Sequence, residues 1–202
     1  MVEKAVESYS WQVVPIDSSH CPTDEALEKL IIDCKKTTDE KYAQILCRLK
    51  RKLTHPVRER ETELGDLFCD ILRDATGADV FLVASGSIRG EEIGPIVTKG
   101  DLTSCLPYDD EVHIVYMTGA QLKHGMLHAL RDETLSGAHS EFFQVSSGLR
   151  IEYDQSSHDF ESFALNGGEI GELTATHVHM LLGPRTEVPC QASVRESSEQ
   201  VA

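Results

Sequence analysis

Basic residues are scarce in this chain. Its 202 residues include 19 lysines and arginines against 34 aspartates and glutamates, which gives a formal net charge of −15. A chain this acidic is poorly suited to bind a nucleic-acid backbone or an anionic lipid surface. No segment approaches the roughly 20 consecutive apolar residues that span a bilayer. We therefore expect no nucleic-acid partner and no membrane partner.

An apolar leader and a Cys-x-x-Cys pair are also missing. Residues 1–14 contain no apolar core of the about 7–15 residues that a secretory signal needs. The six cysteines are spaced singly, and four of them lie within apolar patterns. Such thiols are typical of a reduced, intracellular chain. We expect a cytoplasmic protein; a disulfide-bonded extracellular protein that has lost its leader is the alternative.

Motifs of the common catalytic classes do not occur. The chain has no Walker-type phosphate loop, no nucleophile elbow and no His-Glu-x-x-His zinc motif. His124 and His128 share a face at helical spacing, and His177 and His179 share a face at strand spacing. Either pair could supply two metal ligands, but neither has a third ligand nearby in sequence. We therefore expect no metal site and no cofactor in this chain.

What remains is a globular composition, with 40% hydrophobic and 26% charged residues. Helical and strand patterns are interleaved from about residue 42 to 185, which predicts an α/β fold, a mixed α+β sheet with helices. Residues 186–202 are polar and predict a frayed tail.

Residues 1–41 differ from the rest. Trp11–Ile16 reads as a short strand, and Thr23 is the expected cap of a helix that Lys35 and Lys36 close. Thr37–Asp39 would be a linker or a second cap. Residues 42–53 fit a helix face and a strand face equally well.

Local signals after residue 57 are clearer. They predict an amphipathic helix from Leu64 to Leu72 with Gly77 as its C-cap, a buried strand at Asp79–Val83, a short helix opened by Thr98, a strand around Val112–Tyr116, a capping box at Thr118–Gln121, a strand around Leu149–Tyr153, a hairpin at Asn166–Gly167 and a last strand around Val178–Leu182.

The strand Asp79–Val83 leads into a loop of small residues, Ser85–Ser87, followed by Arg89. Ligands bind at the carboxyl ends of strands in open α/β sheets, and Arg89 offers a fork of donors to a phosphate, a carboxylate or a ribose. A surface loop with a solvated arginine is the alternative.

Three further side chains are candidates for binding. Arg58 and Arg60 precede the helix that begins near Glu63, where they either point to solvent or join the helix end in holding an anion. Tyr108 follows Pro107 in a turn, where it either stacks on a base or caps the edge of the core.

Five ordered stretches share one pattern: Arg60–Leu67 with Asp70 (compare R-E-x-N-L-G-N-L-x-x-D-A), Ala84–Arg89 (N-G-G-G-I-R), Gly100–Leu102 with Leu106–Tyr108 (G-D-L…L-P-F), Met117–Lys123 (L-T-G-x-Q-L-K) and Phe142–Asp154 (F-L-Q-V-S-G-L-R-x-x-Y-D). Together they resemble the C-terminal domain of the 5'-nucleotidase family, two-domain metallophosphoesterases.

The resemblance implies a substrate-binding domain at residues 42–185. In the family, an N-terminal domain with two divalent metals performs hydrolysis, and the C-terminal domain grips the nucleoside. By position, Arg60 and Arg89 would hold the phosphate or ribose, Gly86 would belong to the binding loop, and Tyr108 would be one of two aromatics that sandwich the base. Residues 1–41 would be the tail of a phosphoesterase domain and a connecting helix. The resemblance also favours a strand at Ile45–Leu49.

The chain departs from the family pattern at several places. The Asp-x-His and Gly-Asn-His-Asp metal motifs of the catalytic domain do not occur, so we expect no hydrolysis by this chain alone. Ala84 replaces the asparagine that meets the base. Ser85 and Ser87 replace glycines, where side chains are expected to hinder close approach to the backbone. The second stacking aromatic is missing after Tyr153.

Three functions follow from these observations. The first is the nucleotide-recognition part of a 5'-nucleotidase-type phosphohydrolase in nucleotide catabolism, with the metallophosphoesterase domain encoded elsewhere as its partner. The second is a nucleotide-binding module without catalysis. The third is a degenerate domain retained for structure or interaction.

Overall fold

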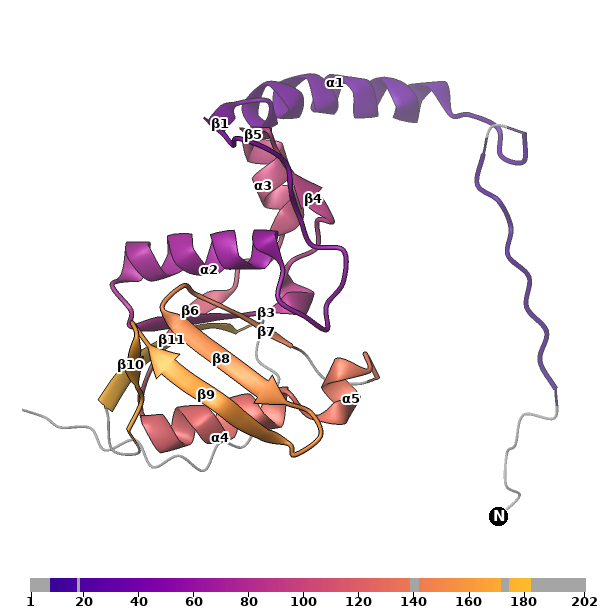
Figure 1. The fold of residues 1–202 in the computed structure, drawn as a ribbon. Helices are drawn as coiled ribbons and strands as arrows, with labels where there is room; N and C mark the ends of the chain where they lie inside the picture. Colours follow the sequence, from indigo (N-terminus) through magenta and orange to yellow (C-terminus); the bar gives the residue numbers. More distant parts are fainter. Residues whose placement is uncertain (1–7, 18, 139–141, 172–174, 183–202) are drawn as a thin grey trace, which may run out of the picture. The chain divides into compact units, whose positions relative to one another are not determined.

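The computed structural model describes residues 8–17, 19–138, 142–171 and 175–182. The chain divides into two compact units, Met1–Gln44 and Ile45–Ala202. Figure 1 shows both as a ribbon. Within the described residues, none of the helices combines the length and apolar character needed to cross a bilayer.

In its described residues, 8–17 and 19–44, the first unit holds one helix, α1 (Glu25–Tyr42). Its N-cap is Asp24, one residue after the expected Thr23, because the Asp24 carboxylate accepts from the backbone N–H of Ala26 and Leu27. The expected end near Lys36 is wrong, since the helix continues to Tyr42, where the Ala43 N–H donates to the Asp39 carbonyl at 2.8 Å.

The strand expected at Trp11–Ile16 is also wrong. The backbone there has no strand pairing, and Trp11, Val13 and Ile16 are largely exposed. Apolar alternation by itself does not make a strand, because a strand also needs a partner for its backbone hydrogen bonds.

The second unit interleaves strands and helices as predicted: β1 (Ile45–Arg48), β2 (Leu53–Thr54), α2 (Glu63–Thr76), β3 (Val80–Ala84), the 3-10 turn η1 (Ser85–Ser87), β4 (Glu92–Ile93), β5 (Ile96–Thr98), α3 (Lys99–Cys105), β6 (Glu111–Thr118), α4 (Gly119–Ala129), α5 (Asp132–Leu135), β7 (Phe143–Val145), β8 (Leu149–Asp154), β9 (Asp159–Leu165), β10 (Gly168–Glu169) and β11 (Ala175–Leu182). The strand assigned from the resemblance at Ile45–Leu49 is confirmed as β1.

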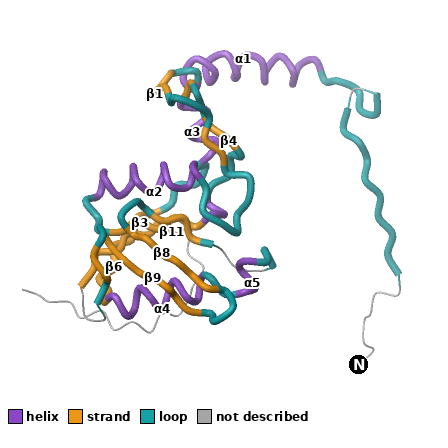
Figure 2. The backbone as a smooth tube through the Cα atoms, viewed as in Figure 1, coloured by secondary structure: helices purple, strands orange, loops and turns teal. Residues whose placement is uncertain are grey.

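The main sheet has the strand order β6-β11-β3-β7, in which only β11 and β3 run parallel. A second sheet has the order β10-β9-β8, and β1 pairs with β5 while β2 pairs with β4. Helix α2 covers one face of β3, and α4 with the β8–β9 hairpin covers the other (Figure 2).

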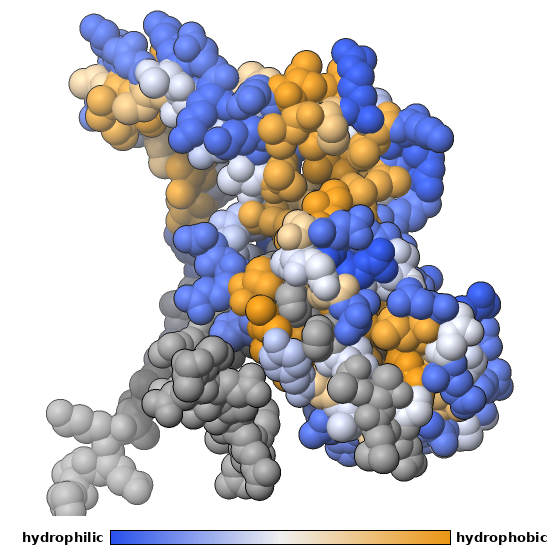
Figure 3. All heavy atoms as spheres, turned by 90° about the vertical axis from the view of Figure 1, so that its left-hand side faces the viewer, coloured by the Kyte–Doolittle hydropathy of each residue, from blue (hydrophilic) through white to orange (hydrophobic). Residues whose placement is uncertain are grey.

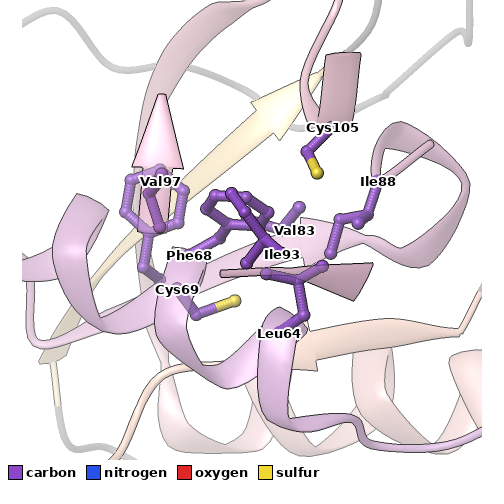
Figure 4. Close-up of a cluster of buried hydrophobic side chains, with 9 residues drawn as sticks. Leu64, Phe68, Cys69, Val83, Ile88, Ile93, Val97 and Cys105 are labelled. Carbon is purple, nitrogen blue, oxygen red and sulfur yellow. The ribbon is translucent and has the colours of Figure 1, made fainter. Parts of the chain in front are cut away.

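Strand β3 has both faces in the core, which explains its nearly continuous apolar sequence. Phe81 and Val83 pack against Leu64 and Phe68 of α2, in the cluster drawn in Figure 4. On the opposite face, Val80 and Leu82 belong to a second cluster, whose other buried members are Leu122, Met126, Leu149, Phe163 and Val178.

The capping signals after residue 57 are confirmed. Gly77 ends α2 in the left-handed conformation, with φ 71°. Thr98 caps α3, and Thr118 with Gln121 forms the predicted capping box of α4. The β9–β10 turn has positive φ at both Asn166 and Gly167, as a tight hairpin turn requires.

Helix α2 approaches β7 closely at Gly65. A Cβ at this position would collide with the side-chain amide of Gln144, which lies buried on β7.

We expect Gly65→Ala to lower the free energy of unfolding by about 1–3 kcal/mol, measured by urea denaturation. Gly125→Ala on α4 is the matched control, since its Cβ would meet nothing within 4 Å. That variant should be slightly more stable than the wild type. Equal effects of the two substitutions would contradict this packing.

Candidate functional site

The buried side-chain amide of Gln144 connects two loops. Its Oε1 accepts from the backbone N–H of Thr62 at 2.9 Å, while its Nε2 donates to the Arg60 carbonyl at 2.8 Å and to Ser85 Oγ at 2.6 Å. Gln144 and Ser85 are fully buried. The amide therefore fixes the segment before α2 against the loop that follows β3.

His55 reinforces the same connection. Its Nε2 lies 3.1 Å from the Ser85 carbonyl oxygen, which can only accept, so Nε2 carries the proton. Its Nδ1 then accepts from the Thr62 hydroxyl at 2.7 Å, and that oxygen accepts from the Gly65 N–H. The pKa of His55 is lowered, mainly because the ring is buried and also because of the charge of Arg58. The lowered pKa favours this neutral form.

The turn η1 presents Gly86 and Ser87 partly to solvent. Ser85 N–H donates to the Phe142 carbonyl at 2.9 Å, and its side chain points inward to Gln144. Of the two serines expected to hinder approach to the backbone, Ser85 therefore turns its hydroxyl away from the surface.

Arg89 and Tyr108 lie together at the surface. Arg89 Nε donates to the Tyr108 hydroxyl at 2.8 Å, and the guanidinium carbon lies 5.4 Å from the ring centroid. The Arg89 N–H donates to the Cys105 carbonyl, which ties the η1 loop to the end of α3. Tyr108 is 44% exposed, so its ring is accessible to a ligand.

Arg60 lines an open pocket of about 300 Å³ before α2, together with Thr54, Pro56, Val57, Glu61, Thr62 and Glu63. Its carbonyl is fixed by Gln144, but its side chain is exposed. In the described part of the chain, no carboxylate forms an ion pair with Arg60 or Arg89, and no hydrogen bond joins the Arg60 side chain to Arg89 or Tyr108. The structure thus joins Arg89, Tyr108 and the loop of Gly86 directly, and Arg60 only through the backbone network.

Acidic residues surround the start of α2. Glu63 is neutralised by a two-pronged ion pair with Arg51, in which Nη2 and Oε1 are 2.6 Å apart. The pKa of Asp66 is raised to about 6, mainly because the carboxyl is buried and also because of the charges of Glu61 and Asp70. Asp66 Oδ1 is buried and has no hydrogen-bond partner among the described residues. An anion at this helix end would meet acidic as well as basic side chains.

The two histidine pairs gain no third metal ligand within the described residues. Among these residues, no group of three His, Cys, Asp or Glu side chains could hold a metal ion. His124 and His128 are exposed on α4. The side chains of His177 and His179 lie outside the described part of the structure, although β11 itself is formed.

Sequence reasoning did not find His55, Thr62 or Gln144 as site-forming residues. A lone histidine and a lone glutamine carry no local signal, because their partners lie up to 30 and 84 residues away. The alternation of side chains along β7 could have placed Gln144 on the inward face of the strand, where a glutamine requires hydrogen-bond partners. It could not have shown which residues those partners are.

The raised pKa of Asp66 predicts that Asp66→Asn stabilises the protein above about pH 6. The folded state keeps the proton up to about pH 6, whereas the unfolded chain loses it near the ordinary value of 3.8. The free energy of unfolding therefore falls as the pH rises through this window. Asparagine carries no charge, so it removes the free-energy cost of ionising a partly buried carboxyl. We put this cost at about 1 kcal/mol after allowing for partial exposure.

Urea denaturation at about pH 4 and about pH 8 tests this expectation. The stabilisation should be present at the higher pH and nearly absent at the lower one. Asp39→Asn, which changes an exposed aspartate of α1, is the control and should have little effect at either pH. A stabilisation by Asp66→Asn that is the same at both pH values would contradict the shift.

Solved structures share this fold. The 5'-nucleotidase precursor of Thermus thermophilus superposes with a TM-score of 0.63 at 19% identity, covering 81% of this chain and 34% of that one. The sulfate thiohydrolase SoxB of the same organism gives 0.62 at 16% identity, with 81% and 32% covered. The NAD nucleotidase of Haemophilus influenzae gives 0.56 at 17% identity, with 78% and 31% covered.

Sequence comparison identifies the family. The trifunctional nucleotide phosphoesterase YfkN of Bacillus subtilis (strain 168) is 26% identical over 148 residues, which are 70% of this chain and 10% of YfkN. The chain thus spans about a third of the solved relatives and a tenth of YfkN. Residues 37–177 match the model of the 5'-nucleotidase C-terminal domain. The chain therefore belongs to the 5'-nucleotidase C-terminal domain family.

Proposed function

We propose that this domain recognises the nucleoside or nucleotide substrate of a 5'-nucleotidase-type phosphohydrolase in nucleotide catabolism. Hydrolysis would be performed by a metallophosphoesterase domain elsewhere in the protein or in a partner chain. The observation that carries the proposal is the exposed pair of Arg89 and Tyr108, which follows the loop of Gly86, a loop that Gln144 fixes through Ser85.

The pair offers two complementary kinds of contact. The accessible ring of Tyr108 provides a stacking surface for a base, and base stacking on an aromatic side chain contributes about 1–3 kcal/mol. The Arg89 guanidinium has donors left after its bond to Tyr108, and these suit a ribose hydroxyl or a phosphate oxygen. Arg60 would supply a second cation toward the phosphate end.

The residues of this chain do not supply the hydrolytic step in the proposal. Two-metal phosphoester hydrolysis requires carboxylate and histidine ligands that activate water and stabilise the leaving oxygen. The Asp-x-His and Gly-Asn-His-Asp motifs that provide them in the family do not occur in the sequence. Binding without turnover is therefore the expected property of the isolated chain.

A domain retained only for interaction is the second candidate, and one surface favours it. Val112, Ile114 and Tyr116 alternate along β6 and are 41%, 58% and 73% exposed, which leaves apolar surface on an edge strand. Apolar patches of this kind mark contact surfaces between proteins. Figure 3 shows apolar surface among polar side chains on one face of the molecule.

Nucleotide affinity separates the two candidates. We expect the full chain to bind AMP in a calorimetric titration, and Tyr108→Ala to weaken that binding about five- to a hundredfold because the stacking surface is lost. Tyr108→Phe keeps the ring and loses only the acceptor for Arg89, so it should change the affinity by about threefold or less.

Tyr116→Ala, which removes an exposed tyrosine from β6, is the control for loss of a surface ring and should bind AMP like the wild type. If neither adenosine nor AMP binds to the wild type, the interaction role is favoured. If Tyr108→Ala binds as tightly as the wild type, the assignment of Tyr108 is wrong.

The division of labour predicts no phosphate release by this chain. Purified protein incubated with a panel of nucleoside monophosphates and Mn²⁺ or Zn²⁺ should release phosphate no faster than buffer does, because the metal motifs are missing. Turnover that disappears in a His177→Ala, His179→Ala variant would contradict the proposal and would identify a metal site on β11.

A further inference from the structure

One residue, His55, holds both ends of the loop from Ser85 to Glu91. Its ring Nε2 donates to the Ser85 carbonyl at 3.1 Å, and its backbone N–H donates to the Glu91 carbonyl at 2.7 Å. Gly86 and Arg89, which the proposed function assigns to ligand binding, lie between these two contacts. The conformation of the candidate binding loop therefore depends on a side chain that lies outside it.

The ring contact completes the hydrogen bonding of the Ser85 carbonyl. This oxygen also accepts from the Ile88 N–H at 3.1 Å, the bond that closes η1, so both of its lone pairs are used. His55 is 5% exposed and Ser85 is fully buried. Water can therefore replace the ring as a donor to this carbonyl only if the loop opens.

The neutral ring suits this position because each of its nitrogens has a partner. Besides the bond from Nε2, Nδ1 accepts from the Thr62 hydroxyl at 2.7 Å. A proton on Nδ1 would make this nitrogen a donor, and the hydroxyl would then have to donate to Gln144 Oε1 at the longer distance of 3.3 Å. In the part of the chain that the structure describes, no carboxylate forms a hydrogen bond with the ring, so a buried positive charge there is unfavourable.

The charged side chains near the ring do not compensate for its burial. Burial lowers the pKa of His55, and so does the charge of Arg58, while the bond to Ser85 and the charge of Glu59 offset only part of this. The other elements around the ring carry these charged residues: Glu61, Glu63, Asp66, Arg89, Glu91 and Glu92. Two of them are neutralised in ion pairs, Glu63 with Arg51 and Glu92 with Lys52.

We propose that His55 is a positioning residue whose neutral ring holds the loop from Ser85 to Glu91 in its binding conformation, so that protonation of the ring releases the loop. An open loop returns the ring to water, where it takes up a proton at the ordinary value of about 6.5. Falling pH therefore favours the open loop, and a nucleoside binds more weakly. The effect on binding rests on the proposed function, whereas the release of the loop does not.

Hydrogen exchange at the Ile88 amide measures the release without any ligand. This N–H donates to the Ser85 carbonyl, so it exchanges when the loop opens. Its NMR protection factor should fall about three- to thirtyfold between about pH 7.5 and about pH 5, because pH 5 lies about 1.5 units below the ordinary value of 6.5. The Leu82 amide of β3, in the core, should not show this fall.

Adenosine binding at the same two pH values tests the consequence for recognition. Adenosine has no phosphate group, so the ligand brings no phosphate titration into this range. In a calorimetric titration of the full chain, the affinity should be at least about threefold weaker at the lower pH, because part of the protein then has an open loop.

Three variants assign the pH response to His55. His55→Gln keeps a donor and an acceptor but cannot take up a proton, so its Ile88 protection should be equal at both pH values. His124→Gln removes an exposed histidine of α4 and is the matched control, which should keep the wild-type fall. Asp66→Asn removes the nearby carboxyl whose pKa is raised to about 6, and it should keep the fall as well.

An NMR titration of the His55 ring in the wild type needs no variant, so it decides even if His55→Gln does not fold. The ring should carry its proton on Nε2 and titrate below pH 6.5. A midpoint at or above that value would overturn the proposal. Constant Ile88 protection at the two pH values, or an equal fall in His55→Gln, would also overturn it.

The two binding outcomes separate this proposal from the proposed function. If adenosine binds equally well at both pH values while the loop opens, His55 does not position the loop for recognition. If adenosine binds at neither pH, the proposed function fails, and the exchange of the Ile88 amide still decides whether the neutral ring holds the loop.

Discussion

The buried amide of Gln144 satisfies polar groups from two segments that are far from it in the sequence. Its hydrogen bonds reach Thr62 and Arg60 before α2 and Ser85 after β3. Each of these groups would be costly to leave unpaired in the interior, because a buried donor or acceptor without a partner costs about 1–3 kcal/mol. Gly65 of α2 packs against the same amide, because the glycine has no Cβ to collide with it. One side chain therefore takes part both in the packing of α2 on β7 and in the pairing of buried polar groups.

This arrangement separates a rigid interior from an adaptable surface. His55, Thr62, Ser85 and Gln144 are buried and fully engaged, and they fix the backbone of the loops. Outside them, the guanidinium of Arg89 retains free donors and the ring of Tyr108 is accessible. Side chains held on fixed loops are suited to binding a ligand without a large ordering cost. The proposed recognition of a nucleotide requires this combination.

Much of the fold could be predicted where the signal is local. The continuous apolar run of β3, the capping box at Thr118 and the turn at Asn166–Gly167 each specify their own backbone. Segment Ile45–Arg48 was ambiguous from local patterns and was assigned only through the family resemblance. Three features could not be predicted. The apolar residues at 11–16 find no strand partner, α1 continues past Lys35 and Lys36 to Tyr42, and the Gln144 network joins residues up to 84 positions apart.

Hydrogen exchange at the Thr62 amide tests most directly whether the Gln144 network holds the two loops together. This N–H is buried and donates to Gln144 Oε1, so it can exchange only when the network opens. NMR-detected exchange should therefore show protection comparable to that of the β3 amides in the core. If Thr62 exchanged as fast as the exposed loop amides beside it, the network would not hold the two loops together, and the geometry of the proposed recognition site would lose its physical basis.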